Sequence, residues 1–438
     1  MIAVVVSRED TASLRIRDAL LEEADWDDHE PSGEWQREWT LGCDTGDDVV
    51  SDGFVMVEKD GLHLYYDGID ADLRAGFDIS LIVFVSRHSG ETGRLLTAHH
   101  TGNFGEAEYG GEDGSLATPA PSATRHLLRR FAENAPEDFD ACMEATHHGP
   151  SELETPSLFA EIGSGEEEWE REDAARAVAE AVLSLPEREE PRTTVVGVGG
   201  GHYAPRFTRV VLETDAAVGH IAADYALDDI DAELVREAYV SSEADALLLD
   251  GGAVEYPPEG TDGYRVVTEK YLRQRADVPE RTADMVFDAL GEDAYLTNRA
   301  AEGAQDGVVR FEAELVREAR TVDRGKTDDA LDAYALGYTE EDGQVSDVVV
   351  ASGDCDALAE ELADVLREKY DVSMESERIV LERDVFDAEK ARELGVKEGP
   401  GFGKLSAGEK VDVDGRTVKP DDVHTSERRM FFLRENDV

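Results

Sequence analysis

Short apolar runs alternate with amphipathic stretches along most of the chain. Five runs of β-branched and aliphatic residues have the length and composition of buried strands: Ile2–Val6, Ile79–Val85, Thr193–Val198, Ala246–Asp250 and Val348–Ala351. Five other stretches have the pattern of amphipathic helices: Arg125–Asn134, Glu166–Leu183, Asp231–Ala238, Asp356–Lys369 and Ala388–Leu394. Strands that alternate with helices predict an α/β fold, with a mixed, mostly parallel sheet flanked by helices.

The character of the chain changes after about residue 272. Ten of the eleven histidines precede this point, whereas six of the nine lysines fall between Lys369 and Lys419. We therefore predict a catalytic core over residues 1–272 and an additional α+β module, a C-terminal extension, over residues 273–438. Within the core, the polar, acidic and Trp-containing stretch Asp27–Asp48 is interpreted as a surface insertion.

The charge balance of this 438-residue chain is extreme. Asp and Glu number 101 against 43 Lys and Arg, a formal net charge of −58. In ordinary salt such a chain repels itself, but in molar salt the Debye length falls to about 3 Å and the repulsion is largely screened. The acid-rich, lysine-poor composition therefore indicates adaptation to high salt. It neither supports nor excludes a nucleic-acid partner.

The cysteines and the lengths of the apolar runs indicate where in the cell the protein is expected. Cys43, Cys142 and Cys355 are odd in number and widely separated, so we expect no disulfide framework. No run approaches the ~18–20 apolar residues that cross a bilayer, and the chain opens directly on a strand-like stretch without a secretory leader. We therefore expect a cytoplasmic protein that contacts no membrane and acts as a monomer.

Four histidine-bearing segments carry the candidate chemistry: Ser86–Gly90, His99–Asn103, His147–Pro150 and Gly199–Arg206. Three of the four follow a strand-like run, at the edge where ligand sites gather in open α/β sheets. Neutral imidazoles bind zinc, and they act as general bases near neutral pH. For any single histidine, the alternative is a buried hydrogen-bonding residue with no chemical role.

Two further features surround these histidines. Glu161 lies in an apolar run before a glycine turn, where a carboxylate could orient a metal-bound histidine or handle a proton. Ser164 is interpreted as the cap of the acidic helix that follows, with Glu167 completing a capping box. The glycines of Gly197–Gly201 could bring amides to an oxyanion or a phosphate, although a tight turn is the simpler explanation. The dinucleotide, P-loop, GxSxG and HExxH patterns are not matched.

Five segments in this order resemble the archaeal and plant D-aminoacyl-tRNA deacylase family: SRHSG (Ser86–Gly90), HTGN (His100–Asn103), HHGP (His147–Pro150), TPSLFAEIGSGEEEW (Thr155–Trp169) and GVGGGHYAPRFT (Gly197–Thr208). The resemblance covers roughly residues 1–272. It implies a phosphorylase/hydrolase-like core, zinc dependence, and hydrolysis of the ester that links a D-amino acid to the 3′ end of tRNA. It also implies broad tolerance of the side chain, with chirality as the discriminating feature.

The residue inventory agrees with such a hydrolysis, which needs an attacking water, a base or metal, and a group that stabilises the oxyanion. Zinc can lower the pKa of its bound water to about 7. We expect catalytic roles for His147, His148 and Glu161. We expect zinc on some of His88, His100, His147, His148 and His202. We expect substrate contacts from Gly199, Gly200, Gly201, Tyr203, Arg206 and Lys404.

The C-terminal part departs from the shorter, core-only members of the family. Its stretch Ala388–Arg416 resembles a segment of ribonuclease Z, which also handles tRNA 3′ ends, but the HxHxDH motif is absent and a nuclease is not implied. A helix that ends at Gly395, followed by a Gly-Pro turn, accounts for the pattern structurally. In the functional interpretation, four basic residues contact tRNA phosphates: Lys404, Lys410, Arg416 and Lys419.

Two other classes of function stay open. One is a peptidyl-tRNA or nucleoside-type hydrolase on the same fold, since a fold does not determine a reaction. The other is a non-catalytic protein that binds tRNA or metal. Turnover of D-aminoacyl-, L-aminoacyl- and peptidyl-tRNA separates these alternatives from the deacylase.

Overall fold

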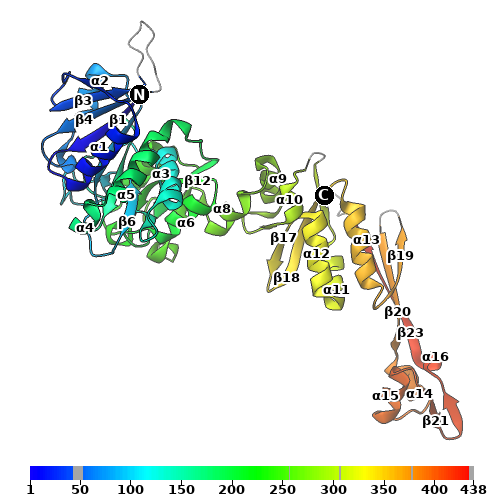
Figure 1. Ribbon diagram of the computed structural model, residues 1–438. Helices are drawn as coiled ribbons and strands as arrows, with labels where there is room; N and C mark the ends of the chain where they lie inside the picture. Colours follow the sequence, from blue (N-terminus) through cyan, green and yellow to red (C-terminus); the bar gives the residue numbers. More distant parts are fainter. Residues whose placement is uncertain (43–52, 256, 305–306, 376–377, 434–438) are drawn as a thin grey trace. The chain divides into compact units, whose positions relative to one another are not determined.

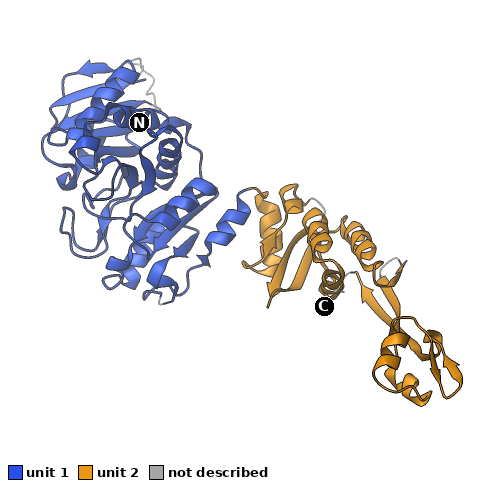
Figure 2. Ribbon diagram, turned by 60° about the horizontal axis from the view of Figure 1, so that its bottom comes forward, with its two compact units in different colours: residues 1–276 blue, residues 277–438 orange. Residues whose placement is uncertain are grey.

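The computed structural model describes residues 1–42, 53–255, 257–304, 307–375 and 378–433. It divides into two compact units, Met1–Ala276 and Asp277–Val438 (Figures 1 and 2). The boundary that we predicted after residue 272 falls within α8 (Glu269–Arg275), which belongs to the first unit. Over the described residues, no helix has both the length and the apolar character needed to span a bilayer.

A mixed sheet of eight strands forms the larger part of the first unit. β4, β1, β5 and β10 run parallel to one another, β6 is antiparallel to β10, and β9 is parallel to β6. In spatial order the strands are β2 (Asp27–His29), β3 (Arg37–Leu41), β4 (Phe54–Lys59), β1 (Ile2–Ser7), β5 (Leu81–Arg87), β10 (Ser157–Gly163), β6 (Leu95–His99) and β9 (Asp140–Met143).

A smaller, fully parallel sheet of four strands completes this unit. Its spatial order is β12 (Ala216–Ala222), β11 (Thr193–Val198), β13 (Ala246–Leu249) and β14 (Val266–Val267). Every residue of β1 and β12 is buried, as is almost every residue of β5 and β11. Strands covered on both faces are largely apolar, which is why short apolar runs could reveal β1, β5 and β11. β12 was not predicted, because Gly219 and His220 interrupt its apolar run. The mixed, mostly parallel sheet is confirmed.

Helices flank the sheets of this unit, and α1 and α3 both pack against α5. The helices concerned are α1 (Thr11–Glu23), α2 (Ile69–Gly76), α3 (Pro121–Asn134), α5 (Glu172–Leu183), α6 (Pro205–Glu213) and α7 (Ala232–Ser241). Local signals start several of them. Asp10 caps α1 by accepting from the amide of Ser13, and Asp231 caps α7. Pro121 occupies the first turn of α3, where its missing N–H costs nothing.

Three expectations for this unit were wrong. The predicted helix Glu166–Leu183 is two helices, α4 (Glu166–Trp169) and α5, and Ser164 caps neither: its hydroxyl donates to the carbonyl of Gly93 at 2.7 Å. The predicted surface insertion Asp27–Asp48 contributes β2 and β3 to the sheet edge, and residues 43–48 of it, including Cys43, lie outside the described residues. The acidic composition hid these strands, because even a buried position of β3 is occupied by an acidic residue, Glu38. Its carboxylate is satisfied by a hydrogen bond from the Trp35 indole at 2.8 Å.

The second unit is α+β, as predicted. Its four-stranded antiparallel sheet has the order β15 (Tyr295–Leu296), β17 (Ala335–Glu341), β18 (Gln344–Ala351) and β16 (Val308–Phe311). Three helices share a core with this sheet: α11 (Ala313–Val322), α12 (Arg324–Tyr334) and α13 (Cys355–Leu366). Two further helices are α9 (Glu280–Leu290) and α10 (Asn298–Ala301). A second antiparallel sheet follows, with the order β19 (Asp371–Glu375), β20 (Arg378–Phe386) and β23 (His424–Phe432).

Residues 387–423, which we call the terminal module, lie between β20 and β23. These strands pair from Arg378 with Phe432 to Phe386 with His424, so the chain leaves and returns at one end of the ladder (Figure 1). The module contains α14 (Ala388–Glu393), α15 (Pro400–Ser406), β21 (Val411–Val413), β22 (Arg416–Val418) and α16 (Pro420–Val423). Its own small core consists of Ala391, Val396, Leu405, Val418 and Val423. The turn predicted after α14 is confirmed, with Gly395 at a φ of +80°.

Candidate functional site

The candidate site lies where the two sheets of the first unit meet. The segment 144–148, which follows β9, joins them through its backbone. Its amides donate to the carbonyls of Ala98 in β6, His202 after β11 and Ile221 in β12, at 3.2, 2.7 and 2.9 Å. Residues that follow strands of both sheets are thereby brought to one place, as expected for a ligand site at strand ends.

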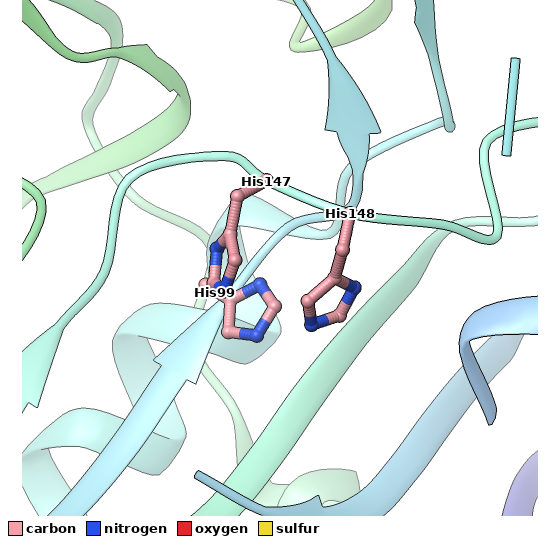
Figure 3. Close-up of side chains that lie close together, drawn as sticks. All are labelled: His99, His147 and His148. Carbon is pink, nitrogen blue, oxygen red and sulfur yellow. The ribbon is translucent and has the colours of Figure 1, made fainter. Parts of the chain in front are cut away.

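Three imidazoles converge at this junction, from His99 at the end of β6 and from His147 and His148 (Figure 3). The ring centroid of His99 lies 4.3 Å from that of His147 and 4.9 Å from that of His148. The centroids of His147 and His148 are 4.3 Å apart. Adjacent residues on a strand point to opposite faces. His147 and His148 share one site because the chain turns at His148, whose φ is +49°.

The three rings are held in the same way. The Nδ1–H of His99, His147 and His148 donates to the carbonyls of His100, Ala145 and Gly149, at 3.1, 2.8 and 2.7 Å. Each hydrogen bond places the ring proton on Nδ1 and leaves the lone pair of Nε2 for another partner. The Nε2 of His99 is buried and has no hydrogen-bond partner among the described residues. One ligand atom from each ring can be chosen so that all three lie within 4.8 Å of one another.

Two buried carboxylates adjoin the imidazoles. Glu144 accepts a hydrogen bond from His202 Nε2 at 3.0 Å, and its other oxygen lies 3.2 Å from His88 Nδ1. Burial acts to raise the pKa of Glu144, but the contacts with His202 and His88 outweigh it and hold that pKa well below its ordinary value. The carboxylate of Glu161 lies 3.7 Å from His99 Nε2 and 3.8 Å from His88 Nδ1. Burial raises the pKa of Glu161.

The protonation of the three rings differs. Burial and the charge of His99 lower the pKa of His148 to about 3, and the same causes hold the pKa of His147 well below its ordinary value. Both rings are therefore neutral at neutral pH, the form that binds a metal. Burial also acts to lower the pKa of His99, but the nearby carboxylate of Glu161 outweighs it and raises that pKa.

Two cavities adjoin the histidines, and they share Tyr109, His147, His148 and His202 in their linings. The first cavity, about 490 Å³, is also lined by Asn103, Phe104, Glu106, Thr146, Tyr225 and Asp229. The second cavity, about 500 Å³, is also lined by Leu62, Leu64, Ser86, His88, Glu161 and Tyr203. A substrate that reacts at the shared histidines has space on either side of its reacting atoms.

His100 does not join this cluster, contrary to expectation. Its Nδ1 donates to the carbonyl of Gly219 at 3.0 Å, and its Nε2 accepts from the hydroxyl of Thr124 at 2.8 Å. Both ring nitrogens are therefore satisfied, and burial lowers the pKa of this ring to about 4. His99, the preceding residue, reaches the site instead, because neighbours along a strand face opposite ways.

The glycine turn after β11 does not present the expected row of free amides. The amide of Gly199 donates to the carbonyl of Ala222 at 2.7 Å, and that of Gly200 to the Asp224 carboxylate at 2.9 Å. Both glycines have a positive φ, +91° and +83°, which explains why glycine is needed there. The turn therefore holds the backbone after β11 in place and does not offer these two amides to a ligand. A substrate contact of the exposed Gly201 stays a prediction.

The other expected substrate-binding residues are placed differently. Tyr203 lines the second cavity, with its hydroxyl 3.2 Å from His88 Nε2. Arg206 instead donates to the carbonyl of Leu249 at 2.9 Å and pairs with Asp250 at 3.2 Å, so its guanidinium ties α6 to the loop after β13. Lys404 lies in the terminal module of the second unit, and its contact with substrate stays a prediction.

Two central residues, His99 and Glu144, were missed in the sequence. A signal was present for both: His99 stands in a His-His pair, and Glu144 precedes His147 by three residues. Neither signal was decisive, since the pair does not say which ring faces the site. In so acidic a chain, one more glutamate carries little information.

Comparison with known proteins identifies the family. Residues 75–259 match the D-aminoacyl-tRNA deacylase family model. D-aminoacyl-tRNA deacylases of Natronomonas pharaonis and Haloarcula marismortui are 43% and 37% identical to this chain, covering 98% and 99% of it and all of their own length. The crystal structure of AF0625, a conserved protein of unknown function, is 36% identical, with a TM-score of 0.56, and covers 62% of this chain and 96% of its own. With relatives so similar over nearly its whole length, this chain belongs to the D-aminoacyl-tRNA deacylase family.

Proposed function

We propose that this chain hydrolyses the ester between a D-amino acid and the 3′ end of tRNA, and that it uses zinc to do so. The family relationship supports the reaction. One observation supports the metal: the clustered rings of His99, His147 and His148 each donate Nδ1–H to a backbone carbonyl, which leaves the Nε2 lone pair of each ring for another partner. Imidazole nitrogens suit zinc, and backbone acceptors behind them are the usual support of metal-bound histidines.

The residues present fit the ion. His99, His147 and His148 would hold it, and a second group of possible ligands, formed by Glu144, His147 and His202, shares one of these rings. The buried Nε2 of His99 has no hydrogen-bond partner among the described residues, which supports a bound metal ion at this position. Zinc held by three imidazoles supplies a water that ionises near neutral pH.

His88 and His202 are also predicted from the sequence as zinc ligands, and we propose that they act here as positioning residues. His202 donates to the carboxylate of Glu144 at 3.0 Å, and His88 Nδ1 lies 3.2 Å from the other oxygen of the same carboxylate. Glu144 in turn lies 3.8 Å from His147 Nε2. The two rings therefore orient a carboxylate that faces the imidazole cluster.

The chain's own groups suffice to describe the proton movements. Water attacks the ester carbonyl, and the Glu161 carboxylate, which lines the second cavity beside His99, accepts the proton that this water loses. The C–O bond to the ribose then breaks, and the same proton passes to the departing ribose oxygen. The products are the free D-amino acid and tRNA with an intact 3′ hydroxyl.

Chelation tests the reaction and the metal separately. In molar KCl, we expect the purified protein to release D-tyrosine from D-Tyr-tRNA, and exhaustive chelation to lower the rate by roughly a hundredfold or more, because the activated water is lost. Added zinc should restore the rate. Hydrolysis that survives chelation contradicts the metal and leaves the deacylase standing. Preferential cleavage of peptidyl-tRNA in the same assay supports the alternative hydrolase, and absence of turnover supports a non-catalytic binding protein.

For the terminal module, we propose contacts with the phosphates of tRNA. The side chains of Lys404, Lys410, Arg416 and Lys419 are exposed, and their charged groups form no ion pair within 4 Å among the residues that the structure describes. Elsewhere in this unit, lysines are paired: Lys326 with Glu368, and Lys369 with Glu318. Unpaired cations in so acidic a chain suit an external anion.

Three lysines of the terminal module are tested with a triple variant, and a double variant elsewhere in the unit serves as the control. Replacing Lys404, Lys410 and Lys419 by glutamine should weaken the binding of uncharged tRNA by roughly tenfold and flatten its salt dependence, with kcat unchanged. The control replaces Lys326 and Lys369 by glutamine, which removes two ammonium groups that are already paired. Equal affinities of the two variants for tRNA would contradict a phosphate contact.

A further inference from the structure

Two tyrosines of the first cavity are unusually exposed. The side chains of Tyr109 and Tyr225 are 62% and 61% accessible, yet both line the cavity that His147, His148 and His202 also line. Aromatic rings of this kind contribute little to the core. At the rim of a site they offer a flat apolar face to a ligand.

Tyr109 is held on a braced loop. Its carbonyl accepts from the amide of Gly149 at 3.1 Å, which fixes it to the residue after His148. The side-chain amide of Asn103 donates to the carbonyls of Gly110 and Glu112, at 3.0 and 3.2 Å, and closes the same loop from within. The exposed ring is therefore presented by a backbone tied directly to the imidazole cluster.

Tyr225 is braced by the glycine turn. The amide of Asp224 donates to the carbonyl of Gly200 at 2.8 Å, and the carboxylate of Asp224 accepts from the amide of Gly200 at 2.9 Å. The Tyr225 hydroxyl lies 3.4 Å from Nδ1 of His202, the ring that donates to Glu144. The turn that we expected to bind an oxyanion thus fixes an aromatic ring beside the site.

We propose that Tyr109 and Tyr225 form a stacking surface for the terminal adenosine of tRNA in the first cavity, which leaves the second cavity for the amino-acid side chain. This inference rests on the proposed deacylase function. Bases stack on aromatic side chains, and the one free ribose hydroxyl and the exocyclic amine of the esterified adenosine are donors that suit the carboxylates of Glu106 and Asp229 in the same lining. The second cavity is lined in part by the aliphatic side chains of Leu62 and Leu64, which suit the side chain of an amino acid. The ester between the two halves then lies at the shared histidines.

The test compares Tyr225→Ala, Tyr109→Ala and Tyr225→Phe with Tyr295→Ala, which removes an exposed tyrosine of the second unit. Loss of either stacking ring should raise KM roughly fivefold or more, with little change in kcat. In Tyr225→Ala, which alters the lining of the first cavity and not of the second, KM should rise by the same factor for D-Tyr-tRNA and D-Ala-tRNA. The inhibition constant of free adenosine should rise by a similar factor. Tyr225→Phe keeps the ring and should keep the wild-type inhibition constant of adenosine, although it loses the hydroxyl beside His202. Tyr295→Ala should behave like the wild type throughout.

Other outcomes overturn the inference. In Tyr225→Ala, a KM that rises for D-Tyr-tRNA but not for D-Ala-tRNA would mean that the first cavity holds the side chain. Unchanged adenosine inhibition in both alanine variants would mean that neither ring contacts the base. If the wild-type protein does not deacylate at all, the proposed function fails. Adenosine binding, measured by calorimetry on the wild type and Tyr225→Ala, then still decides whether the tyrosines bind a nucleoside.

Discussion

Replacement of His148 by alanine should lower the rate of D-aminoacyl-tRNA hydrolysis by roughly a hundredfold or more, and reduce the zinc content of the purified protein. Its ring packs against both His99 and His147, with centroids 4.9 and 4.3 Å away, so its loss removes one of three convergent imidazoles. Both cavities also lose a shared wall. The measurements are single-turnover deacylation in molar KCl and metal analysis of the dialysed protein.

His126→Ala is the matched control, because it removes an imidazole outside the cluster. That ring lies in α3 and is hydrogen-bonded to the Ser184 hydroxyl at 2.8 Å. The control should keep both zinc and activity. Thermal unfolding of both variants separates a local loss from general destabilisation. Full activity and full zinc content in a folded His148→Ala protein would remove this residue from the proposed site.

Lowering the salt concentration should destabilise the whole chain. The net charge of −58 makes the folded state repel itself once counterions are diluted, because the Debye length grows from about 3 Å at 1 M to about 10 Å at 0.1 M. We expect the midpoint of thermal unfolding to fall by roughly ten degrees or more between 3 M and 0.1 M KCl. Differential scanning calorimetry across a KCl series measures this directly.

Sucrose distinguishes charge screening from a general solvent effect. It favours compact states because it is excluded from the protein surface, but it does not screen charge. Sucrose in 0.1 M KCl should therefore restore only a small part of the lost stability. An unfolding midpoint independent of KCl, or fully restored by sucrose, would contradict the interpretation of the acidic composition as salt adaptation.

Much of the fold could be predicted from local pattern. β1, β5 and β11 are buried on both faces, so their apolar runs are continuous and visible without a structure. The edge strands β2 and β3 were harder, because neither is an apolar run: β2 is exposed and acidic, and β3 mixes charged with apolar residues. Both strands were missed for this reason, although Trp39 within β3 and Trp35 just before it are buried.

By itself, the sequence determined the family, the α/β class and the segments that carry the chemistry, because a motif is a local pattern that can be recognised without a structure. Only the tertiary structure decided which side chains meet. It selected His99 over His100, because the alternation of a strand sends neighbours to opposite faces. It brought Glu144 against His88 and His202, residues 56 and 58 positions away in the chain. In the folded chain, the amides of Gly199 and Gly200 donate to Ala222 and Asp224 and are not free for a ligand. Such hydrogen bonds between distant segments form only once the chain has folded.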